Sequence, residues 1–64
     1  MMKLSTMSNY DRQKIPEILA GEGTWFGAHL LRLIAKADQN NIELIRKGFP
    51  DQVKAVEDYR TSNN

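Results

Sequence analysis

The chain has 64 residues, with no cysteine and a single histidine, His29. Without cysteine it can form neither a disulfide nor a thiolate metal site, and one histidine is too few for a typical zinc site. We therefore expect no metal and no cofactor. A domain of this size buries only about 60% of the surface that its unfolded chain exposes. Tight helix packing, self-association into a homodimer, or both must then stabilise it.

Long hydrophobic runs and an excess of one charge are also missing. The longest uncharged apolar stretch spans only residues 25–31, whereas a helix that crosses a bilayer needs about 20 apolar residues. Residues 1–7 contain no apolar core region, so we expect no signal peptide and a cytoplasmic location. Nine basic and eight acidic residues give a formal net charge of +1, which is not the charge pattern of a strong non-specific nucleic-acid binder.

Two prolines, Pro16 and Pro50, each follow a large apolar residue and precede an acidic one. Proline suits the first position of a helix, and an acid next to it meets the positive end of the helix dipole. We therefore predict helices over about residues 16–20 and 50–60. Gly21 stands where a left-handed C-terminal cap would fall.

Two further helices are predicted in the middle of the chain. Thr24 is a candidate N-cap for a long helix over about residues 25–37. Asn40 and Glu43 have the spacing of a capping box, which predicts a shorter helix over about residues 41–47. No segment alternates with period two. The expected fold is all-α, a small compact bundle of three to four short helices in one domain over residues 9–60. Ser8 to Gln13 can add a turn, and residues 1–8 and 61–64 are expected to be disordered.

One face of the long helix carries the expected core stripe, in a band about 100° wide. Its members are Phe26, Leu30, Leu33, Ile34 and Ala37. Leu31 lies off this stripe and is expected to meet another helix.

The opposite face carries an indole, an imidazole and two cations within about 60°. We call this face the cationic ridge; its residues are Trp25, His29, Arg32 and Lys36. In one interpretation the tryptophan packs over a neighbouring helix and the cations are solvated. In the other the ridge is a contact surface, because Trp and Arg dominate interface hot spots. The same face could stack a base or hold a phosphate, but the balanced charge favours a protein partner.

Catalysis and nucleic-acid binding are less favoured. His29 lacks a clear orienting partner, although Asp38 or Glu22 could pair with it, and so small a chain leaves little room for a substrate pocket. We therefore do not expect an enzyme. Residues 21–24 lack the strand and the longer pattern of a phosphate-binding loop.

The order of long helix, turn and shorter helix also fits a dimeric helix-turn-helix regulator. In that alternative the asparagines would read bases and the cations would contact phosphates. The residues concerned are Asn40, Asn41, Arg46 and Lys47. In the same helix Ile42, Leu44 and Ile45 are interpreted as packing residues.

The stretch from Leu19 to Asp38, followed by Asn41, Phe49-Pro50 and Val53, resembles a group of short bacterial and phage-borne proteins. They share the pattern Gly-x-Gly-x-Trp-Phe-x-Ala-His-Leu-Leu-Arg-Leu-Ile-x-Lys-Ala-Asp followed by Phe-Pro. The resemblance spans roughly residues 15 to 56 and implies no established activity. It suggests a product of a phage or another mobile element, a setting in which tiny proteins often bind one host component, as anti-CRISPR proteins do.

We therefore hypothesise a small helical interaction protein that binds and masks a host protein through the cationic ridge. The alternatives are the dimeric DNA-binding regulator and a minor structural or assembly protein. No membrane partner is expected.

Overall fold

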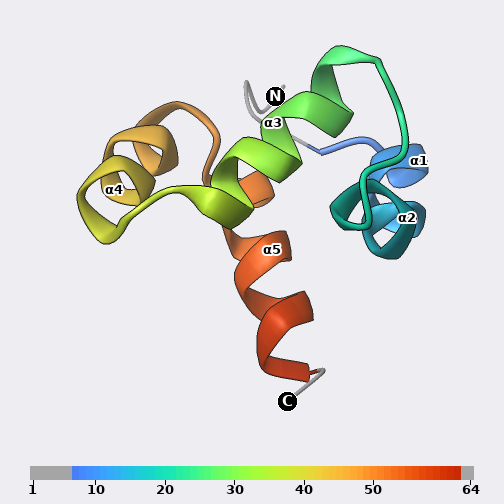
Figure 1. Cartoon of the computed structure of the whole chain (residues 1–64). Helices are drawn as coiled ribbons and strands as arrows, with labels where there is room; N and C mark the ends of the chain where they lie inside the picture. The colour runs from blue at the N-terminus through green and yellow to red at the C-terminus, as the bar shows by residue number, and fades with distance from the viewer. Residues whose placement is uncertain (1–6, 63–64) are drawn as a thin grey trace, which may run out of the picture.

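The computed structural model of the chain describes residues 7–62. This part contains five helices and no strand: α1 (Asn9–Gln13), α2 (Ile15–Leu19), α3 (Phe26–Lys36), α4 (Gln39–Gly48) and α5 (Pro50–Ser62). Helix α3 runs through the middle, with α1 and α2 on one side of it and α4 on the other (Figure 1). The all-α prediction is confirmed. The number of helices exceeds the predicted three to four because the turn expected ahead of Pro16 forms a helix of its own.

The ends that were expected to be disordered, residues 1–8 and 61–64, lie partly outside the described residues. Within the described part, Met7 is buried in the core. The Ser8 hydroxyl accepts a hydrogen bond from the Asp11 backbone N–H at 3.0 Å and so caps α1. Residues 61 and 62 belong to the last turn of α5.

The glycine connector between α2 and α3 follows the prediction at Gly21, which has a φ of +112°. Gly23 has a φ of +100°, and a Cβ atom there would lie 2.6 Å from the Trp25 ring. Glycine is the residue that adopts this conformation without steric cost. At Gly23 it also lets the indole lie directly against the backbone.

Two of the predicted N-caps are wrong. Helix α3 begins after Trp25, which makes no side-chain capping bond, so Thr24 is not the cap. The carbonyl oxygens of Glu22 and Gly23 are held by Arg32, and the chain becomes helical only beyond that attachment. Asn40 does not cap α4 either. The Asp38 carboxylate accepts from the Asn41 backbone N–H at 2.8 Å, and α4 starts two residues earlier than predicted.

The core forms where α3 packs against α2 and α5, while α4 rests on α5. Its fully buried side chains larger than alanine come from α2, α3 and α5: Ile18, Leu31, Ile34, Val53 and Val56. At the far end of α3, Arg60 donates a hydrogen bond to the Ala35 carbonyl at 3.0 Å. This bond ties the C-terminal turn of α5 to the last turn of α3, where helix carbonyls have no intrahelical partner.

The buried face of α3 is rotated by roughly a quarter turn from the predicted stripe. Leu30 and Ile34 are buried as predicted, but Phe26 is 69% exposed and Leu33 is 52% exposed. Leu31, placed off the stripe, is fully buried together with Ala28. Ala28 on this side lies against Gly23 of the connector, so the buried face includes alanine in place of two large apolar residues. Phe26 and Leu33 are consequently left at the surface.

None of the helices within residues 7–62 is long and apolar enough to cross a lipid bilayer.

Candidate interaction site

Trp25, at the start of the predicted cationic ridge, is bound to α1. Its indole Nε1 donates a hydrogen bond to the Asp11 carboxylate at 2.8 Å. The Tyr10 ring lies 5.4 Å from the indole, centroid to centroid, at an interplanar angle of 56°. Trp25 is nevertheless 37% exposed. Trp25 therefore fastens α1 to the start of α3 and presents only part of its surface to solvent.

Arg32 is a clasp on the connector between α2 and α3. One terminal guanidinium nitrogen donates to the carbonyls of Ile18 at 3.1 Å and Glu22 at 2.7 Å. The other donates to the Gly23 carbonyl at 2.7 Å. Hydrogen bonds from a charged donor are stronger than neutral ones. The Ile18 carbonyl also accepts the Gly21 backbone N–H at 3.0 Å, whereas the carbonyls of Glu22 and Gly23 lie in the connector, outside any helix. Arg32 thus has a structural task and is half-buried.

The other two residues of the ridge are exposed. The Nδ1 atom of His29 lies 3.4 Å from the Arg32 guanidinium. The side chain that His29 contacts is therefore that of Arg32, and not that of Asp38 or Glu22. Lys36 makes no ion pair within the described residues. The structure therefore divides the ridge: Trp25 and Arg32 hold the fold together, whereas His29 and Lys36 are available for contacts.

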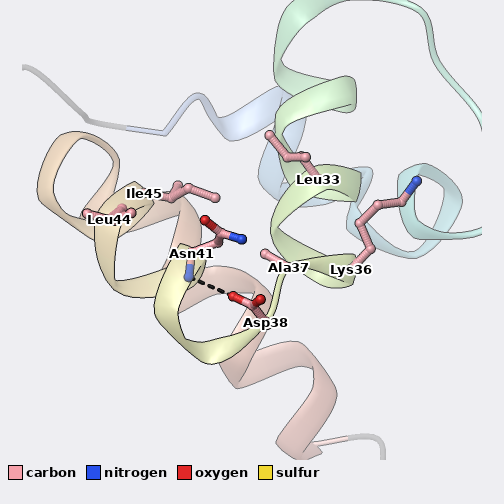
Figure 2. A pocket seen from close by; sticks show the side chains of 7 residues that line it. All are labelled: Leu33, Lys36, Ala37, Asp38, Asn41, Leu44 and Ile45. Carbon is pink, nitrogen blue, oxygen red and sulfur yellow. Dashed lines mark hydrogen bonds between the residues drawn. The ribbon is translucent and has the colours of Figure 1, made fainter.

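A groove of about 570 Å³ opens between α3 and α4. The residues that line it are Leu33, Lys36, Ala37, Asp38, Asn41, Leu44 and Ile45. Leu33, Lys36 and Ala37 come from α3 and its C-terminal end; Asn41 and Ile45 on α4 point toward α3, and Leu44 lies farther from it (Figure 2). Helix α4 is held by α5 and does not pack closely on α3, which is why the groove stays open.

Exposed apolar side chains mark both walls of the groove. Leu33 is 52% exposed and Leu44 is 56% exposed. Phe26 lies two turns before Leu33 on the same face of α3, with its ring 6.2 Å from that of Phe49. Neighbouring apolar side chains at the surface are typical of interaction sites.

This groove was not predicted from the sequence, because Leu33 was expected in the core and Leu44 was interpreted as a packing residue. A signal was present for Leu44. It stands four residues after Asn40 and three before Lys47, as the one apolar side chain on a polar stripe of α4.

The residues proposed to read DNA lie on α4, but Arg46, one of the two cations among them, is paired with acidic side chains. Arg46 forms hydrogen-bonded ion pairs with Glu43 at 3.2 Å and Glu57 at 2.8 Å. The hydrogen bond with Glu57 is the main reason why the pKa of Arg46 is raised and that of Glu57 lowered. Asn40, Asn41 and Lys47 are exposed. Of the two cations in this set, Lys47 alone makes no ion pair within residues 7–62, which weakens a phosphate-binding role.

Within residues 7–62 no group of three or more His, Cys, Asp or Glu side chains is arranged to hold a metal ion. Comparison with protein-family models, curated proteins and solved structures finds no match to this chain. The candidate site therefore depends on its geometry alone.

Replacing Arg32 by alanine is expected to lower the free energy of unfolding by about 1–3 kcal/mol, because the carbonyls of Glu22 and Gly23 lose their charged donor. Lys36→Ala, one turn further along the same helix, removes an exposed cation and is expected to change stability by less than about 0.5 kcal/mol. Urea unfolding followed by circular dichroism measures both. Equal effects of the two substitutions would show that the clasp does not stabilise the connector.

The Arg46–Glu57 ion pair predicts a pH dependence of stability. The pKa of Glu57 is lower in the folded chain than in the unfolded one, so the unfolded chain takes up its proton first as the pH falls. The contribution is present above the unfolded pKa of about 4.3 and is lost as the pH falls through the folded pKa. Between about pH 6 and pH 3, the wild type should lose more stability than Glu57→Gln. The measurement is the melting temperature of both proteins over that pH range. An equal decrease for the wild type and for Glu57→Gln would contradict the prediction.

Proposed function

We propose that this protein is a small helical interaction protein that holds an amphipathic helix of a partner protein in the groove between α3 and α4. By covering the apolar face of that helix it would mask the helix from its normal contacts. The observation that carries the proposal is the open groove, with exposed leucines on both of its walls.

The apolar walls and the volume of the groove suit a bound helix. Recognition of a helix in a groove relies on a few apolar anchors spaced by three, four or seven residues. Leu33 on one wall and Leu44 on the other provide apolar surface for such anchors. Ala37 has a small side chain and therefore takes up little space on the α3 wall. Phe26 extends the apolar surface along α3 toward its N-terminus. A volume of about 570 Å³ falls in the range of sites that bury a ligand well.

The charged side chains at the groove determine which partner helices it would prefer. Lys36 lies on the α3 side of the groove, and its side chain extends away from α4 (Figure 2). Lys47 lies on α4, one turn after Leu44, and makes no ion pair within residues 7–62. The carboxylate of Asp38 is engaged at the N-terminus of α4. Lys36 lines the groove and Lys47 lies one turn beyond Leu44 on α4, so two cations without an ion pair within residues 7–62 lie at or near the groove, which favours a partner helix whose apolar stripe is flanked by Asp or Glu.

The resemblance of residues 15–56 to phage-borne proteins supports a host protein as the partner. In this proposal the contact surface keeps Lys36 of the predicted cationic ridge. Its apolar part moves from Trp25 to Phe26, Leu33 and Leu44, because the indole is committed to Asp11 and Tyr10.

The test uses a defined probe, a helical peptide with leucines at positions i, i+3 and i+7, glutamates beside them and no arginine. Titration followed by NMR should shift amide signals of α3 and α4 around Leu33, Lys36 and Leu44. A matched peptide with lysines in place of the glutamates should bind at least about fivefold more weakly, because it repels both cations. The double variant Leu33→Ala/Leu44→Ala should weaken binding about tenfold or more.

The control variant Tyr10→Ala removes a comparably exposed apolar side chain on the other side of α3 and should bind the peptide as the wild type does. Equal binding of the two peptides, or signal shifts outside the groove, would overturn the proposal. Concentration-dependent shifts of the groove signals without any peptide would also overturn it, because a second copy of the chain would then be the occupant.

A further inference from the structure

A second hollow lies on the opposite side of α3 from the groove, between the N-terminal helices and the start of α3. Its volume is about 140 Å³, and Tyr10, Lys14, Glu17, Glu22 and Trp25 are among the residues that line it. None of them lines the groove between α3 and α4. The hollow therefore offers a separate site.

Two aromatic rings form a fixed wedge in this hollow. The ring centroids of Tyr10 and Trp25 are 5.4 Å apart, the ring planes are inclined at 56°, and both residues line the hollow. The bond from the indole Nε1 to Asp11 fixes the orientation of Trp25. The absence of a side chain at Gly23 lets the indole lie against the connector. A ligand that stacks here meets rings already held in place, which lowers the entropy cost of binding.

The hollow already attracts a cation of the chain itself. The Lys14 ammonium lies 5.7 Å from the centroid of the Tyr10 ring, within the range of a cation–π interaction. Two carboxylate side chains, those of Glu17 and Glu22, line the same hollow. The guanidinium of Arg32 lies nearby, but it is bound to backbone carbonyls that include those of Glu22 and Gly23. Lys14 is thus the cation that shares the hollow with the rings and the two acids.

We propose that this hollow binds the guanidinium group of an arginine side chain. A guanidinium is planar, stacks on aromatic faces and is more weakly hydrated than an ammonium, and its fork of donors pairs with carboxylates. The wedge supplies the faces, and Glu17 and Glu22 supply the acceptors. Lys14 sits on a flexible stem and gives way to the incoming group. This site goes beyond the groove and does not depend on the function proposed for it.

The experiment uses Trp25 as its reporter, because it is the one tryptophan of the chain. Titration with N-acetyl-arginine amide should change the indole fluorescence with a dissociation constant of about 1–10 mM. The neutral isostere N-acetyl-citrulline amide and the lysine analogue should bind at least about fivefold more weakly. Equal responses to arginine and citrulline would overturn the proposal. Tetramethylammonium binding as tightly as the arginine compound would also overturn it, because the rings alone would then hold any weakly hydrated cation.

Variants separate the parts of the site. Glu17→Gln/Glu22→Gln changes two exposed side chains, leaves the rings in place and should weaken arginine binding about fivefold. Tyr10→Leu should weaken it to a similar degree, with circular dichroism confirming that the helices persist. Lys14→Gln removes the internal competitor and should tighten binding about threefold. An unchanged affinity in the glutamine pair would remove the carboxylates from the site and refute the proposal.

Discussion

The guanidinium of Arg32 is the attachment that determines how the rest of this chain is arranged. Backbone N–H groups of residues 20–22 close the end of α2 by donating to the carbonyls of Pro16, Glu17 and Ile18, but the glycine connector that follows forms no regular structure. Arg32 reaches both regions, donating to Ile18 at the end of α2 and to Glu22 and Gly23 in the connector. The connector is thereby held against the side of α3 that carries Arg32, next to Ala28. This attachment brings α2 against α3, and the buried face of α3 forms around Ala28 and Leu31.

The two sides of α3 differ as a consequence. Toward the N-terminus of the chain, the attached connector, Trp25 and α1 form a polar and aromatic surface with a small hollow. Toward α4, the side chains of Phe26 and Leu33 have no helix above them, because α4 is held by α5. The Arg46–Glu57 ion pair, at 2.8 Å, belongs to that attachment of α4. Exposed ion pairs contribute little individually, so burial of Val53 and Val56 must hold α5 in the core.

The sequence predicted the all-α class, the helix starts at the two prolines and the left-handed Gly21. Each of these depends on local chemistry that proline, acid and glycine express by themselves. The caps at Thr24 and Asn40 and the buried face of α3 depended on contacts between distant residues. A helical wheel places Phe26 and Leu33 in the core because they are large and apolar, and it contains no information on the connector that packs against Ala28 at Gly23.

The candidate site was foreseen only in part. The cationic ridge combined residues that the wheel places together, and the structure gives Trp25 and Arg32 internal partners that no periodic pattern reveals. The groove arises between two helices that do not pack closely on each other, so neither its existence nor the exposure of Leu44 follows from a single segment.

The orientation of α3 is the central claim, because the groove exists only if Leu33 faces solvent. The chain has no cysteine, so single variants Leu33→Cys and Leu31→Cys each carry one thiol whose labelling rate under native conditions reports exposure directly. The account predicts that the thiol at position 33 reacts within about tenfold of its rate in the unfolded chain. The thiol at position 31 should react at least about a hundredfold more slowly, because it requires an opening of the core. Fast labelling at position 31 and slow labelling at position 33 would contradict the account and close the groove.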